Sequence, residues 1–252
     1  MSQNYRYVVD RARDWHGNLP AEPRLLDYGC GAGRAVEVAL QEDFDAHGVD
    51  LYYSGGSSER LARSSGLWGT RIHRLKGSGQ IPFENESFDV IIANQVFEHL
   101  EDFGVPLKEI WRVMRSDGIF INVFPSQLVW REGHCGIPLA HRFRRGSQAR
   151  YWYTLGLRLV GFGSHKEGKG VREWTRHKLE WLDRWVFYRG LDDILNEFER
   201  GFFVDTRDAD FILYRIRHHK ILRPLERILS SEFLGPFFRF TARRLALPYT
   251  HI

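Results

Sequence analysis

The chain has 252 residues and a formal net charge of +4, and 43% of its residues are hydrophobic and 27% charged. This composition is that of a soluble globular protein, and the length suits one domain with elaborations around a sizeable core. No apolar run approaches the ~20 residues that span a bilayer. The first residues lack the apolar stretch of a signal peptide, and only two cysteines occur, so we expect a cytoplasmic protein without a disulfide framework.

The basic residues are concentrated in two segments. Residues 126–188 carry 12 Lys and Arg against 5 Asp and Glu, and residues 215–252 carry 8 against 2, so the remainder of the chain is acidic. Such concentration indicates an anionic partner, whether a lipid headgroup, a phosphate or a nucleic acid, although two well-solvated faces would give the same pattern.

The first elements predicted along the chain are a helix, a buried strand and a glycine loop. A stripe of apolar residues predicts a helix within residues 1–18, and the short apolar run Arg24–Tyr28 suits a central parallel strand. The strand leads into glycines at positions 29, 31 and 33 and then into a helix expected over Arg34–Gln41. Glycine allows a sharp turn and a close approach of ligand to the main chain, and the helix N-terminus presents free N–H groups.

An acidic residue ends the next predicted strand, Asp45–Asp50. Asp50 lies 21 residues after Gly29. Ligands of parallel sheets bind beyond the carboxyl ends of the strands, and a carboxylate at this distance is placed to accept hydrogen bonds from both hydroxyls of a ribose. Leu51 follows directly after Asp50.

The glycine loop closely resembles motif I of the class I S-adenosylmethionine-dependent methyltransferases. Its spacing is G-x-G-x-G, and Asp27 stands two residues before the first glycine. The resemblance implies that the glycines wrap the methionine half of the cofactor S-adenosyl-L-methionine and that Asp27 fixes the loop and the cofactor amino group. The later segments Ile81-Pro82-Phe83 and Ser87–Asn94 resemble the type 11 branch of this family in particular.

The remaining pattern predicts a Rossmann-like methyltransferase fold with a seven-stranded, mostly parallel α/β sheet. Further strands are expected at residues 71–76, 90–93 and 119–124, and helices at 57–64, 106–115 and 191–198. Residues 201–206 and 210–216 are interpreted as strands six and seven, with strand seven antiparallel and inserted between strands five and six. We expect a methyltransferase domain over residues 1–217, an acceptor-side insertion at 126–188 within it, and a basic amphipathic tail at 218–252.

The cofactor-binding residues predicted in this way come from the glycine loop and from the segments that follow three other strands. They are Asp27, Gly29, Cys30, Gly31, Gly33, Asp50, Leu51, Gly77, Ser78, Asn94 and Gln95. One position departs from the family pattern, because Gly77 and Ser78 stand where relatives usually carry an aspartate for the adenine amino group. The hydroxyl of Ser78 or a backbone carbonyl is expected to substitute.

The insertion carries the residues expected to act on the acceptor. It holds five of the eight tryptophans, and its turn Glu132-Gly133-His134 follows closely on strand five. A histidine of near-neutral pKa suits deprotonation of a hydroxyl, so His134 is the first choice of general base, Glu132 is expected to orient it or to bind a sugar hydroxyl, and His141 is the second choice. A histidine between glycines can also serve only to hold its loop. The spacing matches no zinc signature, and we expect no bound metal.

Two other features have competing interpretations: the turn that contains Glu98 and His99, and the C-terminal tail. Glu98 and His99 resemble a turn that is largely structural in type 11 relatives, although both side chains can take protons or coordinate a metal ion. In the tail, Pro224 and Pro236 can each begin an amphipathic helix with basic and aromatic residues. Such helices suit the surface of an anionic membrane, and they equally suit packing on the fold or on a partner.

The sequence therefore predicts a methyltransferase that O-methylates a sugar or lipid-linked saccharide in cell-envelope glycan biosynthesis. We expect a small-molecule or glycolipid acceptor and a peripheral contact with the membrane through residues 218–252. Alternatives among enzymes are C-methylation of a prenylated quinone and methylation of RNA, which ranks lower because no RNA-binding module is recognisable. An alternative of another class is a non-catalytic cofactor-binding scaffold.

Overall fold

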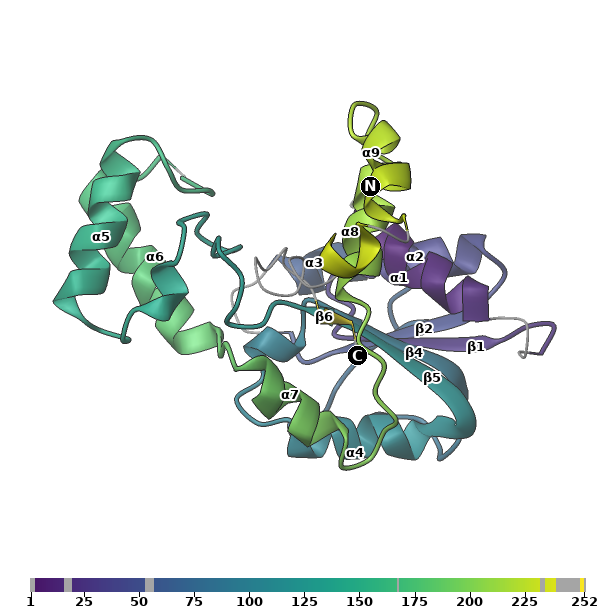
Figure 1. Cartoon of the computed structure of the whole chain (residues 1–252). Coiled ribbons are helices and arrows are strands. Elements are labelled where there is room, and N and C mark those ends of the chain that lie inside the picture. The colour runs from purple at the N-terminus through teal and green to yellow at the C-terminus, as the bar shows by residue number, and fades with distance from the viewer. Residues whose placement is uncertain are drawn as a thin grey trace.

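A computed structural model of the chain contains a central β-sheet with helices on both faces (Figure 1). It describes residues 3–15, 20–52, 57–166, 168–231, 234–238 and 250–251. The strands of the sheet are β1 (Arg24–Tyr28), β2 (Asp45–Asp50), β3 (Ile72–Arg74), β4 (Phe88–Asn94), β5 (Met114–Phe124) and β6 (Thr250–His251). Their order is β3-β2-β1-β4-β5-β6, parallel throughout except for the antiparallel pair β5–β6. The Rossmann-like α/β class predicted from the sequence is confirmed.

The helices cover the sheet in two layers, with a small lobe beside them. The helices and 3-10 turns are α1 (Gln3–Asp14), α2 (Arg34–Gln41), α3 (Ser58–Ser64), η2 (Phe97–His99), α4 (Gly104–Val113), η3 (Ala140–Arg142), α5 (Gln148–Leu159), α6 (Val171–Trp185), α7 (Leu191–Phe198), α8 (Asp208–Arg217) and α9 (Arg223–Leu229). One core joins α1, α2, α3 and α8 to one face of the sheet, and a second core joins η2, α4 and α7 to the other. The strands of the centre are buried on both faces, as parallel strands require.

The end of the predicted sheet differs from the structure. Residues 210–216, interpreted above as strand seven, belong to helix α8, and residues 201–206 form no strand. In α8, Phe211 and Tyr214 lie three residues apart on one helical face, and both rings pack edge-on against Tyr7 of α1, with ring centroids 4.9 Å away. A short apolar run cannot by itself distinguish a strand from a buried helix, and here packing on α1 selects the helix.

The antiparallel neighbour of β5 is therefore a different segment from the one predicted. It is β6, whose Thr250 and His251 pair with Phe124 and Val123. In the described part of the chain the sheet thus has six strands in place of the expected seven. Residues 239–249, which include most of the second predicted tail helix, lie outside the described residues.

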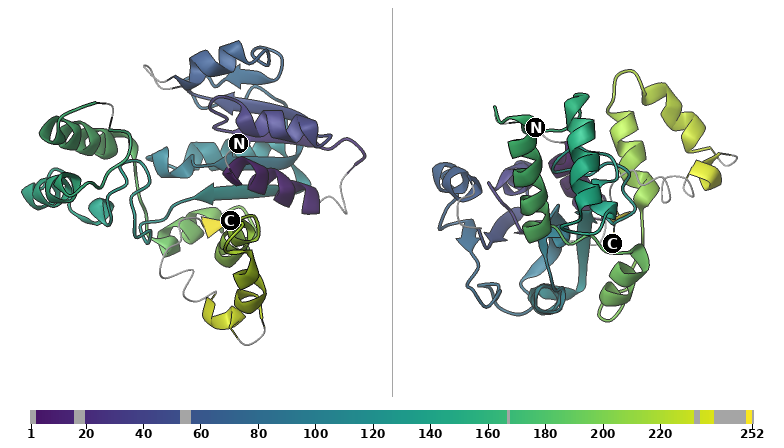
Figure 2. Two further views of the ribbon diagram at one scale, coloured as in Figure 1. Left: turned by 90° about the horizontal axis from the view of Figure 1, so that it is seen from above. Right: turned by 90° about the vertical axis from the view of Figure 1, so that its left-hand side faces the viewer.

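Residues 126–188 form a lobe that lies beyond the carboxyl ends of the strands (Figures 1 and 2). Its helices α5 and α6 pack against each other over a small core of their own, made of Cys135, Ile137, Ala140, Trp174, Leu179, Leu182 and Val186. Trp174 is fully buried in this core and donates its indole N–H to backbone carbonyls at residues 164 and 165. It therefore stabilises the lobe, whereas Trp130 and Trp152 are exposed on its surface.

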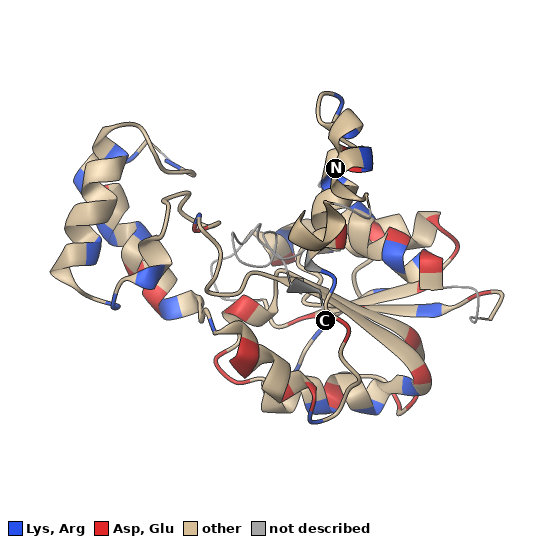
Figure 3. Cartoon of the chain, in the orientation of Figure 1, with Lys and Arg blue, Asp and Glu red and all other residues tan. Residues whose placement is uncertain are grey.

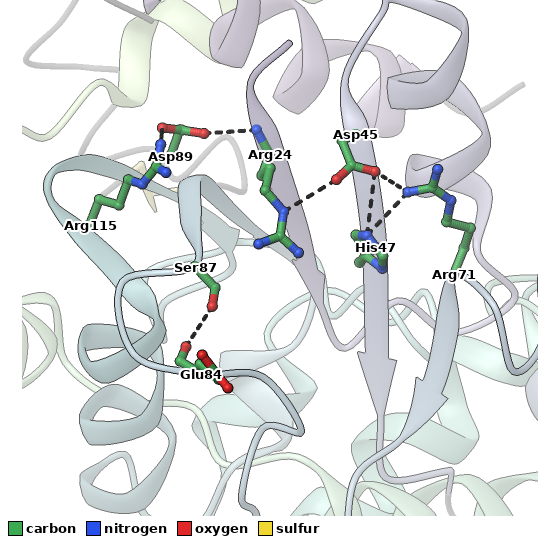
Figure 4. A network of polar contacts seen from close by, with 8 residues as sticks. All are labelled: Arg24, Asp45, His47, Arg71, Glu84, Ser87, Asp89 and Arg115. Carbon is green, nitrogen blue, oxygen red and sulfur yellow. Dashed lines mark hydrogen bonds and ion pairs between the residues drawn. The ribbon is translucent and has the colours of Figure 1, made fainter. Parts of the chain in front are cut away.

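A network of ion pairs joins the strands at their amino ends (Figure 4). Asp45, at the start of β2, pairs with Arg71 and also with the Nε of Arg24, at 3.2 Å. Asp89 of β4 accepts a hydrogen bond from the backbone N–H of Arg24 at 2.8 Å and pairs with Arg115 of β5. These contacts fix the relative positions of four adjacent strands at their amino ends, on the side of the sheet away from the lobe.

Candidate active site

A pocket of about 300 Å³ opens at the carboxyl ends of β1, β2 and β4. It is lined by Asn4, Tyr5, Asp27, Gly29, Cys30, Gly31, Asp50, Tyr52, Ser58, Glu59, Asn94 and Gln95. Parallel strands place the residues that follow them along one edge, so segments far apart in the sequence meet here. Seven of the eleven predicted cofactor-binding residues line this pocket.

The carboxylate of Asp50 links the glycine loop to the end of β2. Its Oδ2 accepts the N–H of Gly31 at 2.9 Å, and its Oδ1 accepts the N–H of Tyr52 at 2.7 Å. Each carboxylate oxygen can accept a second hydrogen bond, so this arrangement orients Asp50 and leaves acceptor capacity for ligand hydroxyls. The Tyr52 hydroxyl in turn donates to the carbonyl of Gly31 at 3.0 Å, which closes the loop on the pocket.

Two carboxyl groups in this pocket, the buried Asp27 and the partly buried Asp50, form no ion pair with the described residues. Asp27 is 3% exposed, and burial together with the charge of Asp50 raises the pKa of its carboxyl to about 8. Burial also raises the pKa of Asp50, against the hydrogen bonds from Tyr52 and Gly31 that lower it. A positively charged ligand group would stabilise both groups as carboxylates, because a nearby positive charge favours the ionised form.

The glycine loop approaches the segment after β4 so closely that a side chain cannot fit at its first glycine. A Cβ atom on Gly29 would lie 2.4 Å from Cγ2 of Val96, and the residue has a φ of +77°. Gln95, on the opposite wall, also has a positive φ of 62° and is held by hydrogen bonds from its N–H and its side-chain amide to the carbonyl of Val123. The pocket walls are thus fixed by backbone contacts between neighbouring strands.

Four of the predicted cofactor residues lie outside the lining of this pocket. Gly33 is the N-cap residue of α2 and lies beside Ile72. Leu51 packs against the second hydrophobic core. Gly77 and Ser78 are exposed in the turn after β3. The predicted set also lacked five lining residues, namely Asn4 and Tyr5 of α1, Tyr52 after β2, and Ser58 and Glu59 of α3. The expected helix at the N-terminus was the available signal for the first two.

A buried carboxylate holds the imidazole of His134 in the lobe. Glu132 is 0% exposed, and its Oε1 lies 2.7 Å from Nδ1 of His134 and accepts the Tyr188 hydroxyl at 2.8 Å. Its Oε2 accepts the backbone N–H of Cys135 at 2.5 Å. Although burial opposes both effects, the pairing lowers the pKa of Glu132 to about 2 and raises the pKa of His134.

The same contacts orient the imidazole. Because a carboxylate can only accept, Nδ1 of His134 carries the hydrogen and its Nε2 is left with a lone pair in the neutral ring. The sequence-derived pair is therefore brought together in the structure. His141 lies on the other side of Tyr188, with ring centroids 4.8 Å apart, and its Nε2 is 3.1 Å from the carbonyl of Gln127.

Helix η2 connects the cofactor pocket to the lobe. It begins two residues after Gln95, and the backbone carbonyl of Glu98 accepts the N–H of Phe187 at 2.7 Å. His99 lies against the lobe, with its ring centroid 5.0 Å from that of His134 and its Nδ1 2.7 Å from the carbonyl of Trp185. The residues predicted to bind the donor and those predicted to act on the acceptor therefore lie at the same end of the sheet.

This fold, with its glycine loop and the acid after β2, defines a class I S-adenosylmethionine-dependent methyltransferase domain, the cofactor-binding part of an enzyme. A protein-family model described as "Methyltransferase domain" matches residues 26–122, from β1 to β5. Over these residues the chain matches the type 11 branch of the methyltransferase domain family.

Curated relatives share this domain and differ in what their names say they do. The human mitochondrial arginine-hydroxylase NDUFAF5 is 24% identical over 140 residues, which cover 55% of this chain and 38% of that protein. A ubiquinone biosynthesis O-methyltransferase of Azorhizobium caulinodans is 30% identical over 99 residues, covering 39% and 38%. The chain thus spans about two fifths of the length of these relatives.

A solved structure extends the likeness to almost the whole chain at the level of fold. A geranyl diphosphate methyltransferase in complex with S-adenosylmethionine superposes with a TM-score of 0.52 and 16% identity, covering 98% of this chain and 82% of the other. At this identity the match shows the fold. The acceptor must be argued from the residues of this chain.

Proposed function

We propose that the protein transfers the methyl group of S-adenosylmethionine to a hydroxyl oxygen of a sugar or lipid-linked saccharide in the biosynthesis of a cell-envelope glycan. The observation that carries this proposal is the pair formed by Glu132 and His134, 2.7 Å apart at the end of the sheet where the donor pocket opens. An oriented imidazole of this kind suits removal of a hydroxyl proton as the oxygen attacks the methyl carbon.

The reaction needs proton removal and no covalent enzyme intermediate. The acceptor oxygen forms a bond to the methyl carbon while the carbon–sulfur bond of the sulfonium breaks, which leaves neutral S-adenosylhomocysteine. His134 Nε2 takes the hydroxyl proton, and the buried charge of Glu132 stabilises the imidazolium that results. Glu132 acts through His134 and is a positioning residue.

Aromatic and basic side chains around this pair support a sugar acceptor. The Trp181 ring is partly buried, with its centroid 5.2 Å from that of His134, and it offers an apolar face on which a sugar ring can stack. Lys and Arg residues are distributed along α5 and α6 (Figure 3), where they suit the phosphate of a lipid-linked saccharide.

The tail supports a contact with an anionic membrane surface. Ile221, Leu222, Leu225 and Ile228 expose 81%, 39%, 43% and 51% of their surface, and basic residues of the same segment lie among them. No described helix is long and apolar enough to cross a membrane. We expect vesicles with anionic lipid to bind the protein, and an Ile221→Asp/Ile228→Asp variant to float with them less. Equal flotation of both proteins would contradict the membrane contact.

The proposed activity is tested by product analysis. We would incubate the protein with S-adenosylmethionine and fractionated cell-envelope glycans, and measure S-adenosylhomocysteine together with products heavier by one CH₂ group. A modified saccharide with the methyl on oxygen supports the proposal. Transfer to a prenylated quinone or to RNA would replace it with one of the alternative enzymes, and a protein that binds the cofactor without any turnover would be the scaffold.

A further inference from the structure

We propose that Glu98, His99 and His134 form a binding site for a divalent zinc-class metal ion between helix η2 and the lobe. One potential ligand atom from each of these residues lies within 4.8 Å of the others. Two imidazoles and one carboxylate are the ligand types of catalytic zinc sites, which keep a fourth position open. The three residues come from both sides of the junction, so the ion would join the cofactor half of the enzyme to its lobe.

The strongest observation is the state of Glu98. Its side chain is 1% exposed, and neither of its carboxylate oxygens has a hydrogen-bond partner among the described residues. Burying a carboxyl group without a partner is energetically costly, and such groups are rare in folded proteins unless an ion or water satisfies them. A cation between Glu98 and the two histidines supplies the missing partner.

The two histidines are already oriented as metal ligands usually are. Nδ1 of His99 is 2.7 Å from the backbone carbonyl of Trp185, and Nδ1 of His134 is 2.7 Å from Oε1 of Glu132. Both oxygens can only accept, so each Nδ1 carries a hydrogen and each Nε2 presents a lone pair. A carbonyl or carboxylate behind Nδ1 is the usual outer partner of a ligating histidine.

The geometry requires a small closure on binding. Around a tetrahedral zinc ion with bonds of about 2.0–2.1 Å, ligand atoms lie roughly 3.3 Å apart, so the ligands must move inward from their present separation. His99 and His134 are partly exposed at the junction, which leaves their rings room to turn. The sequence indicated only that Glu98 and His99 can coordinate a metal ion, because the third ligand, His134, lies more than thirty residues further along the chain.

The role of the ion rests on the proposed function. An acceptor hydroxyl that occupies the fourth position would lose its proton to solvent more readily, because a coordinated cation lowers the pKa of a bound hydroxyl. The resulting oxygen anion forms the bond to the methyl carbon as the carbon–sulfur bond breaks. The ion would then replace the imidazole as the activating group, with His134 serving as a ligand.

The test uses the full chain after treatment with a chelator. Titration with Zn²⁺, followed by calorimetry and by metal analysis, is expected to show one ion per chain, and Co²⁺ should give the visible absorption of a tetrahedral site. Glu98→Gln and His99→Ala should each weaken zinc binding at least about tenfold. His177→Ala, which changes an exposed histidine of α6, should bind zinc as the unchanged protein does.

Folding and function are checked separately. Circular dichroism and titration with S-adenosylmethionine report whether each variant keeps the fold and the donor pocket, which contains none of the three ligands. Absence of zinc binding, or binding that Glu98→Gln and His99→Ala leave unchanged, would overturn the metal site. If the zinc-free protein still methylates a saccharide, the proposed function stands without the ion. If the protein binds zinc at these residues and methylates nothing, only the metal site stands.

Discussion

Acidic residues at the two ends of the sheet have opposite surroundings. At the amino ends, Asp45 is held by arginines, and although partial burial opposes it, the hydrogen bond and charge of Arg71 lower its pKa (Figure 4). At the carboxyl ends, Asp27 and Glu98 are buried with no ion pair in the described part of the structure, and burial raises the pKa of each carboxyl to about 8. Charges paired within the protein stabilise the fold, whereas unpaired ones are available to a ligand.

The largest expected effect concerns the acceptor side of the carboxyl end. Replacing His134 by Ala should lower kcat by about 10²–10⁴-fold, because the group that activates the acceptor is lost. The dissociation constant of S-adenosylmethionine should stay within about twofold, since His134 does not line the donor pocket. Steady-state rates and calorimetry measure the two quantities, and a His134→Ala protein with normal kcat would remove this residue from the chemistry.

A matched pair of substitutions tests the comparison between the two ends directly. Asp27→Asn should weaken binding of S-adenosylmethionine by about 10–100-fold, which corresponds to the loss of a charge-assisted hydrogen bond of about 1.5–3 kcal/mol. Asp45→Asn should leave that affinity unchanged and lower the free energy of unfolding by about 1 kcal/mol, because two arginines lose a partly exposed partner.

The Asp27→Asn variant should bind the donor less well but be more stable than the parent at high pH. The folded pKa of Asp27 is raised to about 8, so the native protein holds a proton that the unfolded chain releases near pH 4. The unchanged protein therefore loses stability as the pH rises from about 4 to about 8, and the variant lacks this loss. Thermal unfolding at several pH values measures the difference. A variant less stable than the parent at pH 8 would show that Asp27 is structural.

Two glycines of the loop should respond differently to a methyl group. Gly29→Ala should lower the free energy of unfolding by about 1–3 kcal/mol, because its Cβ would overlap Val96 and its φ is positive. Gly31 also has a positive φ, but a Cβ atom there would meet nothing within 4 Å. Gly31→Ala should therefore carry only the smaller backbone penalty of about 1 kcal/mol. Denaturant unfolding of both variants is the measurement, and equal losses would mean that crowding against Val96 is unimportant.

The sequence predicted best what local spacing determines. The strand β1, the glycines and Asp50 form one continuous βαβ unit, and Asp27, Gly29, Gly31 and Asp50 of this unit line one pocket. Helix α8 was predicted wrongly because Phe211 and Tyr214 make their contacts with Tyr7, about two hundred residues earlier, and no local pattern records that packing. The closeness of Glu98 and His134 likewise depends on how the lobe packs against η2.

The last expected effect is the pH dependence of donor binding. If Asp27 holds the cationic amino group of the cofactor, as the family resemblance implies, binding requires the ionised carboxylate. Below its pKa of about 8 the free protein must release a proton to bind, so affinity should rise by up to about tenfold per pH unit from pH 6 to 8.

The Asp27→Asn variant isolates this contribution. The cofactor's own amino group titrates near pH 7.7–8.0, roughly as a free α-amino group does, and it reduces affinity at higher pH in both proteins. Calorimetry across this range should therefore show a rising affinity in the parent and none in the variant up to about pH 7.5. Parallel curves for the two proteins would mean that the buried carboxyl does not meet the donor's charge, and that the contrast between the ends of the sheet is one of burial alone.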